Sequence, residues 1–271
     1  MLLYLMLAGF ACLAGVTTVL FGFGGGFVVV PLLYRTLIAH YGADSAIGGV
    51  AMHIAVATST CVMIVTAVLA TRRHARKGNI LWPQVWPLAA YIGIGAVVGA
   101  AAATLANGEF VRWAFVVYLG ASILDCVARK GFMTQADDNT PRAPGVFITA
   151  IAGVVIGVIA TFLGVGGSVM TVPMMRRRGL DMTRATAMAN PLTVPVALAG
   201  TATYMLMAWH QPVPLSAWHV GYVDLAAFAV LTCGSLIGVQ AATPMIGRIP
   251  DRLHAQIYVA LLSLVLISMA I

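Results

Sequence analysis

The sequence contains few charged residues, and this scarcity excludes an ordinary soluble domain. Charged residues make up 8% and hydrophobic residues 61% of the 271 residues, and the mean hydropathy is +0.97. Soluble domains carry about 25% charged residues. The composition therefore indicates an integral membrane protein.

Paired cysteines and catalytic motifs are also missing. The cysteines lie singly in apolar stretches, without CxxC spacing, so neither a disulfide framework nor a zinc site is indicated. No GxSxG, HExxH or P-loop motif is present. We therefore predict a protein that is not an enzyme, with no catalytic residues, no bound metal, no cofactor and no nucleic-acid partner.

Long apolar stretches fill most of the chain. They form eight blocks, of which six have roughly the 20-residue length that spans a bilayer, whereas the first and fifth are too long for one span. The blocks are residues 2–39, 46–70, 83–105, 110–128, 145–178, 185–208, 220–243 and 253–271. This pattern predicts an all-α polytopic membrane protein with up to about ten spans.

The basic residues indicate how the chain is oriented. Thirteen of the fifteen Lys and Arg residues lie in four short segments, at 72–77, 129–142, 176–184 and 248–252. Positively charged loops stay on the cytoplasmic side of a membrane. We therefore expect a multi-pass protein of the cytoplasmic (inner) membrane, with these four segments inside and both termini outside.

A glycine-rich stretch occurs twice, 142 positions apart. Residues 22–31 read GFGGGFVVVP, and residues 164–173 read GVGGSVMTVP. The orientation of the loops requires each long block to be a hairpin with this motif at its tip, one hairpin in each of two inverted repeats. We predict a first repeat at 1–128, a cytoplasmic linker at 129–144 and a second repeat at 145–271. Whether the hairpins cross the membrane fully or turn back midway is open.

Each motif immediately precedes a predicted helix, and this position favours an anion site. The first amide groups of a helix lack intrahelical acceptors and lie at the positive end of its dipole, and glycine lets a ligand approach them. Ser168 adds a hydroxyl donor. The alternative is that the glycines only permit a turn and tight packing. The predicted substrate-binding residues here are Gly22, Gly24, Gly25, Gly26, Gly164, Gly166, Gly167 and Ser168.

Polar residues inside two later blocks extend this prediction. Thr58, Ser59 and Asn190 lie well inside apolar spans, where an unsatisfied polar group is costly, and we assign them to substrate binding; bonds from the two hydroxyls to the preceding helical turn are the alternative. His53 is an intramembrane histidine that we assign to proton coupling. A neutral His53 bonded to a backbone carbonyl is its alternative.

The chain resembles the sulfite exporter TauE/SafE family of membrane transporters. The duplicated glycine-rich motif, the pair Thr58-Ser59 and the layout of apolar blocks carry the resemblance. It implies export of sulfite, sulfonates or other small sulfur-containing or organic anions. Where the family has a second Thr-Ser pair this chain has Asn190-Pro191, so we expect a site shaped for a different anion.

These observations together predict a secondary transporter, most simply an exporter of a small anion. The anion would bind at the midplane between the glycine-rich tips, with alternating access and a proton or sodium ion as coupling ion. An anion channel and a membrane enzyme or assembly factor are the alternatives. The spacings Gly95/Gly99 and Gly234/Gly238 suit close helix packing, either within one chain or between the chains of a homodimer.

Overall fold

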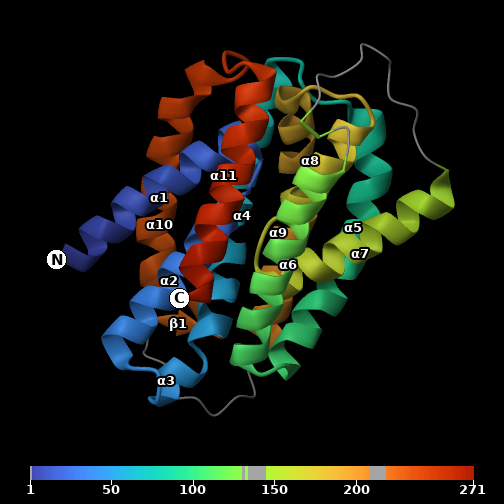
Figure 1. The fold of residues 1–271 in the computed structure, drawn as a ribbon. Helices are drawn as coiled ribbons and strands as arrows, with labels where there is room; N and C mark the ends of the chain where they lie inside the picture. Colours follow the sequence, from blue (N-terminus) through green and yellow to red (C-terminus); the bar gives the residue numbers. More distant parts are fainter. Residues whose placement is uncertain (1, 130–131, 134–144, 208–217) are drawn as a thin grey trace.

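The computed structural model describes residues 2–129, 132–133, 145–207 and 218–271, and these ranges are almost entirely helical (Figure 1). The first half of the chain contains α1 (Leu2–Phe21), α2 (Gly26–Tyr41), α3 (Ala46–Gly49), α4 (Ala51–Arg76), α5 (Trp82–Leu105) and α6 (Gly108–Ala128). The second half contains α7 (Val146–Leu163), α8 (Ser168–Arg177), α9 (Met182–Met207), α10 (Leu225–Ala242), the 3-10 turn η2 (Thr243–Met245) and α11 (Asp251–Ala270). The strands β1 (His219–Val220) and β2 (Val223–Asp224) form a short antiparallel pair. The prediction of an all-α polytopic membrane protein is confirmed.

Six helices in the described ranges are long and apolar enough to cross a bilayer. They are α4, α5, α6, α7, α10 with η2, and α11. Backbone groups must be bonded within the segment inside hydrocarbon, so apolar stretches of this length form helices there. Large apolar side chains face outward from these helices: Leu105 and Phe147 are 80% and 77% exposed. Such outward faces suit contact with lipid chains.

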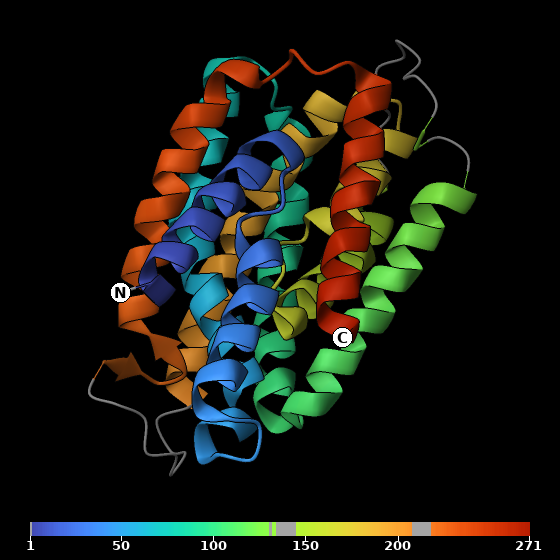
Figure 2. The same cartoon turned by 60° about the vertical axis from the view of Figure 1, so that its left-hand side comes forward.

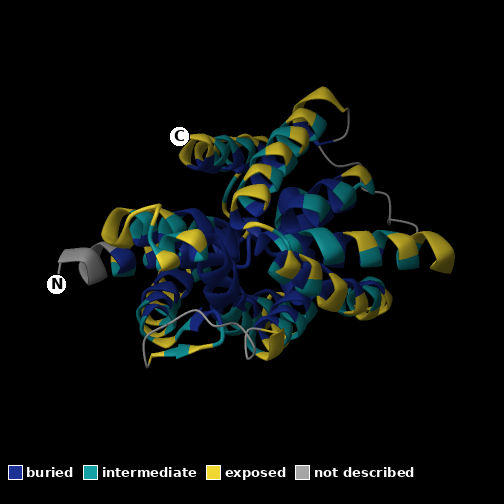
Figure 3. Cartoon of the chain, turned by 90° about the horizontal axis from the view of Figure 1, so that it is seen from below, coloured by how far each residue is buried: buried dark blue, intermediate teal, exposed yellow. Residues whose placement is uncertain are grey.

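The two longest helices, α4 and α9, form the centre of the molecule. Each has 26 residues, and they pack against one another. In the view along the bundle, buried residues gather at the centre and exposed residues face outward (Figure 3). Because neighbouring helices cover them, α4 and α9 can carry hydroxyl and amide side chains that a lipid-facing helix would not tolerate.

The remaining helices surround this central pair in a symmetric arrangement. Helix α1 packs against α10, α7 packs against α5, and α6 packs against α11 (Figures 1 and 2). Helix α4 runs away from the end that carries α3, and α9 runs back toward it. Corresponding helices of the two halves therefore point in opposite directions, as inverted repeats require.

Two breaks in the helical order separate α1 from α2 and α7 from α8. Helix α8 has 10 residues, which is about 15 Å at 1.5 Å per residue. The hydrocarbon core is about 30 Å thick. The second arm of this hairpin is therefore too short to cross the membrane. Helix α2, with 16 residues, is longer but also below the usual spanning length.

The described residues of the four basic segments lie at one end of the bundle. The connections from α4 to α5, from α8 to α9 and from α10 to α11 meet there, and α6 ends there (Figure 1). The opposite end carries α3, the strand pair and the connection from α5 to α6. Most of the predicted linker at 129–144 lies outside the described residues.

The seventh apolar block begins later as a helix than its hydropathy suggests. The block starts at residue 220, whereas α10 begins at Leu225. The Asp224 carboxylate accepts the backbone N–H groups of Ala226 and Ala227, at 2.9 and 3.0 Å, and so caps the helix. This cap fixes the helix start, and the preceding residues form the strand pair.

The paired small residues pack helices within the chain. A Cβ atom at Gly95 or Gly99 would clash with backbone carbonyls of α7, and one at Gly234 or Gly238 would clash with backbone carbonyls of α1. These glycines allow backbones to approach without side chains between them. They are therefore used inside the monomer and do not point to a homodimer.

Candidate functional site

The first break depends on glycine for its backbone conformation. Gly22, Gly24 and Gly25 have φ angles of 75°, 69° and 88°. Side chains with a Cβ atom disfavour this left-handed region. The chain can therefore leave α1, turn and begin α2 within a few residues.

The second break uses its glycines differently. Gly164 has a φ of 67°, whereas Gly167 has a φ of −58° and tolerates any side chain by that criterion. Gly166 and Gly167 are required by space: a Cβ atom would lie 2.8 Å from Thr193 Oγ1 at Gly166 and 2.9 Å from Ile156 Cγ2 at Gly167. The two copies of the motif thus differ in backbone conformation, but both need residues without side chains.

The two breaks lie against one another, although 142 positions separate them. A Cβ atom on Gly26 would lie 2.5 Å from the carbonyl oxygen of Gly164, and one on Gly166 would lie 3.3 Å from that of Phe23. The absence of side chains at both positions allows this contact. The fold therefore brings the two breaks into contact.

Neither helix start has a side-chain cap among the described residues. Gly25 precedes α2 and Gly167 precedes α8, and neither residue has a side chain to accept the first amide groups. Both starts are buried. A buried, uncapped helix start leaves N–H donors at the positive end of the dipole, which is the arrangement that binds anions.

Helix α4 contacts both breaks through hydroxyl groups. Ser59 Oγ lies 2.9 Å from the carbonyl oxygen of Gly164 and 2.9 Å from that of Val56, so it can donate to either. Thr66 Oγ1 donates to the carbonyl oxygen of Gly24 at 2.8 Å. These residues lie seven positions apart, about 10 Å along the helix. Helix α4 thus passes beside both turns.

Helices α7, α8 and α9 carry further buried polar atoms around the two breaks. Asn190 Nδ2 donates to the carbonyl oxygen of Thr186 at 3.2 Å, while its Oδ1 is buried without a partner among the described residues. The hydroxyls of Thr161 and Thr171 are likewise buried and unpartnered there. Unsatisfied buried polar groups are rare and call for a ligand, an ion or water. These atoms favour a polar ligand.

Ser168 begins α8 and is fully buried. Its Oγ lies 3.4 Å from the Gly166 carbonyl oxygen, a long contact, so the hydroxyl is weakly held. Its own carbonyl oxygen accepts the Tyr258 hydroxyl at 3.3 Å, and the Tyr258 ring stacks on Phe23 with ring centroids 4.8 Å apart. Tyr258 of α11 therefore contacts both breaks.

The structure places Thr58 and His53 away from the breaks. Thr58 Oγ1 accepts the backbone N–H of Asp224 at 3.0 Å, so it holds the start of α10. His53 Nε2 lies 3.0 and 3.1 Å from the carbonyl oxygens of Ala103 and Ala106, at the end of α5. Its ring stacks on Tyr222, whose hydroxyl has its pKa raised by burial. His53 therefore has the backbone carbonyl partners expected of a neutral, structural histidine, which is the alternative to proton coupling.

A buried ion pair closes the basic end of the bundle near α8. Arg176 of α8 is fully buried and donates to both carboxylate oxygens of Asp251, at 3.1 and 2.9 Å. It also donates to the carbonyl oxygens of Phe132 and Leu180. The sequence suggests a surface arginine here, whereas the structure uses it to tie α8, α11 and the residues after α6 together.

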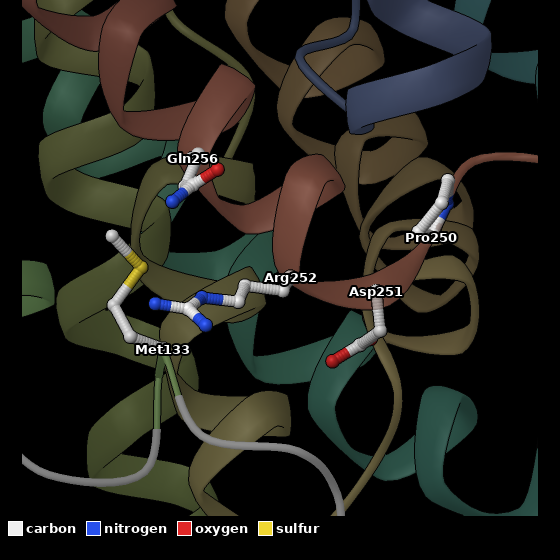
Figure 4. A pocket seen from close by; sticks show the side chains of 5 residues that line it. All are labelled: Met133, Pro250, Asp251, Arg252 and Gln256. Atoms are coloured by element: carbon white, nitrogen blue, oxygen red, sulfur yellow. The ribbon is translucent and has the colours of Figure 1, made fainter.

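A pocket of about 560 Å³ lies beside this ion pair. Arg252 reaches toward Met133 and Gln256, and Asp251 lies on its other side (Figure 4). Pro250 completes the residues that line it. Its donors are a guanidinium and an amide, and none of its lining residues belongs to a break. It is a feature of the basic end, separate from the paired turns.

Sequence reasoning missed several residues that complete the site. Thr66, Thr193 and Tyr258 contact the breaks, and each is a polar side chain inside an apolar stretch. A polar residue inside an apolar stretch can be recognised in the sequence, but there are too many such residues to select these three. The contacts depend on which helices meet, and the sequence alone does not indicate this.

Comparison with known proteins identifies the family of the chain. The family described as sulfite exporter TauE/SafE matches residues 6–269. A probable membrane transporter protein of Haemophilus influenzae is 25% identical over 238 residues, which is 88% of this chain and 87% of the relative. One of Methanocaldococcus jannaschii is 24% identical over 230 residues, 82% of this chain and 77% of the relative. This multi-pass membrane protein therefore belongs to the sulfite exporter TauE/SafE family.

Proposed function

We propose that the protein is a secondary transporter of a small anion, bound between the two glycine-rich breaks and exposed alternately to either side of the membrane. Sulfite, an organosulfonate or a related sulfur-containing or organic anion is the proposed substrate, and export is the proposed direction. The contact between the two breaks, each followed by an uncapped helix start, carries the proposal.

The proposed binding groups follow from the contacts around the breaks. The amides that begin α2 and α8 supply positive ends of dipoles. Ser168 and Ser59 supply hydroxyl groups at the second break. Asn190 bonds to Thr186, whose carbonyl group lies against Gly22, and supplies a buried oxygen without a partner among the described residues. Thr58 is left out of the proposed site, because its hydroxyl lies at the start of α10, where it accepts the backbone N–H of Asp224.

Alternating access is favoured over a channel by the contact between the breaks. Gly26 packs on the carbonyl oxygen of Gly164, so side-chain-free backbones close the path at this level. A channel needs a continuous path in one conformation, whereas a transporter needs a closure that relative movement of its halves can release. We infer that the two inverted halves, 1–128 and 145–271, rock around this contact.

The orientation in the membrane is also a proposal. The described residues of the four basic segments lie at one end of the bundle. We place this end in the cytoplasm, the protein in the cytoplasmic membrane and both termini outside. Coupling to a proton or sodium ion is part of the proposal, with His53 as one proposed proton carrier at the outer end of α4.

The test is the thermal stability of the purified protein in a panel of sodium salts, with chloride as baseline. Sulfite, sulfate, thiosulfate, small sulfonates and carboxylates form the panel. An anion at about 100 times its dissociation constant should add roughly 2.7 kcal/mol to the free energy of unfolding. The shift should disappear in Ser168→Ala. If no anion stabilises the wild-type protein, or the Ser168→Ala protein responds equally, the proposed site is wrong.

A further inference from the structure

A groove runs between α4 and α5, with α9 as its floor. Helices α4 and α5 both pack against α9. The residues that line the groove lie within 68–72 of α4, 82–90 of α5 and 191–198 of α9. Its volume of about 510 Å³ is in the range of small-molecule sites. We call it the α4/α5 groove. None of its lining residues belongs to a break, so it is separate from the proposed anion site.

The α4/α5 groove is apolar over most of its lining and open to the surface of the bundle. Apart from Thr71 and Arg72, its lining side chains are those of valine, alanine, proline, leucine and tryptophan. Leu198 and Trp86, which line it, are 52% and 68% exposed. Since α4 and α5 are long and apolar enough to span the bilayer, this surface meets lipid chains. A small hydrated anion would lose its water here without gaining donors.

The polar groups of the groove lie together near the end of α4. Arg72 is exposed and forms no ion pair among the described residues. Thr71 Oγ1 is buried and has no hydrogen-bond partner in the same part of the chain. An arginine guanidinium binds phosphate oxygens through charge-assisted hydrogen bonds, and a neighbouring hydroxyl can donate another. This end of the groove therefore suits a phosphate group.

Two tryptophans place the polar end at the membrane surface. Trp82 and Trp86 lie one turn apart at the start of α5, and their rings stack with centroids 6.1 Å apart. Both line the groove. Tryptophan is enriched where the hydrocarbon meets the headgroups. The end of α4 and the start of α5 lie at the basic end of the bundle (Figure 1), so the groove leads from the headgroup level into the hydrocarbon.

The charge at Arg72 decides which lipid the groove selects. Lipid chains are as apolar as the lining residues, so a chain gains little by leaving the bilayer for the groove. Contact with the chain therefore fits a lipid without selecting it. Basic pockets between transmembrane helices on the cytoplasmic side select lipids with anionic headgroups. The basic end is the end that we place in the cytoplasm.

We propose that the α4/α5 groove binds an anionic phospholipid, with an acyl chain along α9 and the phosphate at Thr71 and Arg72. The site does not depend on the proposed transport activity. It also contacts the helix that carries part of the proposed anion site, because Pro191 lines the groove and directly follows Asn190.

Headgroup selection is tested by native mass spectrometry of the purified, delipidated protein. Phosphatidylglycerol and phosphatidylcholine with the same chains are titrated separately. The wild-type protein should bind phosphatidylglycerol about fivefold more tightly, as one arginine near the membrane surface predicts, and Arg72→Gln should abolish this preference. Arg76→Gln, at an exposed arginine outside the groove, should keep it. Equal affinities in the wild-type protein, a preference that survives Arg72→Gln, or an equal loss in Arg76→Gln overturns the proposal.

The position of the chain is tested by filling the groove. Ala90→Phe, at an exposed lining residue, should abolish the selective binding of phosphatidylglycerol, whereas Ala121→Phe, at an exposed position of α6 outside the groove, should not. Unchanged binding in Ala90→Phe overturns the proposed position. Soluble glycerol phosphate has the phosphate without a chain and should not displace the lipid. Displacement by glycerol phosphate at the concentrations at which the lipid binds would mean a site for free anions and overturn the lipid assignment.

Discussion

At the scale of single residues, neighbours on α4 have unlike roles. Thr58 accepts the amide of Asp224, whereas Ser59 donates toward the carbonyl oxygen of Gly164. Successive side chains on a helix point about 100° apart. The pair Thr58-Ser59 reads as one motif in the sequence, but its two hydroxyls face different helices. Only Ser59 reaches a break.

This difference gives a matched pair of substitutions. We expect Ser59→Ala to weaken anion binding and Thr58→Val to leave it unchanged, because only Ser59 contacts the second break. Each should lower the free energy of unfolding by about 1 kcal/mol through the lost hydrogen bond. Ligand-induced thermal shifts of the two purified variants check the affinity. Equal loss of anion binding in both would contradict the separation of roles.

Also at this scale, the sequence indicates which residues are polar but not which atoms they reach. His53 stands out because it lies inside an apolar block, and the structure finds it bonded to carbonyl groups of α5. His74 and His254 look like residues at the ends of spans. In the structure they bond to carbonyl groups at the end of α1, from positions 55 and 234 residues away in the sequence. The sequence does not indicate these contacts, because they depend on where α1 ends and on which helices approach that point.

At the scale of helices, glycine positions set the distances between axes. Gly99 of α5 faces a carbonyl group of α7, and Gly238 of α10 faces one of α1, so each half packs one of its helices against the first helix of the other. Association of helices within a bilayer depends on such close backbone contact, because lipid chains are as apolar as the side chains. These glycines therefore allow the close packing of both helix pairs, and the two contacts correspond between the halves.

Adding one methyl group at these contacts should have a large effect. We expect Gly99→Ala to lower the free energy of unfolding by about 1 to 3 kcal/mol, since the new Cβ would overlap the Val158 carbonyl group. Gly120→Ala in α6 is the control, because its Cβ would meet no atom within 4 Å. Thermal unfolding in detergent compares the two. A Gly99→Ala protein as stable as the control would show that the helices are not this closely packed.

Much of the helical architecture could be predicted from the sequence. Spans follow from apolar length, and the glycine-rich breaks follow from the repeated motif, because both depend on local composition. The start of α10 could not be predicted, because the Asp224 cap ends a strand pair inside an apolar block. The burial of Arg176 could not be predicted either, because its partner Asp251 lies 75 positions away.

At the scale of the whole molecule, the distribution of positive charge predicts an orientation. We expect Met245→Cys, at the basic end, to react with a membrane-impermeant thiol reagent only from the cytoplasmic side, and Asp44→Cys, at the opposite end, only from outside. Both positions are exposed. The native cysteines are replaced by alanine, and labelling is compared in intact and opened cells. The reverse pattern would invert the proposed topology.

The inverted halves, the paired breaks and the charge asymmetry support one account of the whole molecule. We propose that a small anion binds at the two breaks and that movement of the halves exposes it to either side in turn. A transporter of this kind exchanges substrate across the membrane even without net flux, whereas an open channel cannot trap a labelled anion against its gradient.

The most direct test is counterflow in proteoliposomes that contain the purified protein. Vesicles are loaded with the unlabelled anion that stabilises the protein, and entry of trace labelled anion is followed. The account predicts transient accumulation of label above the outside concentration. This accumulation should be lost in Gly166→Leu, whose side chain would clash with Thr193 and press on the Phe23 carbonyl group of the other break. Gly120→Leu is the control for reconstitution. Simple equilibration without overshoot in the wild-type protein, or undiminished overshoot in Gly166→Leu, would contradict it.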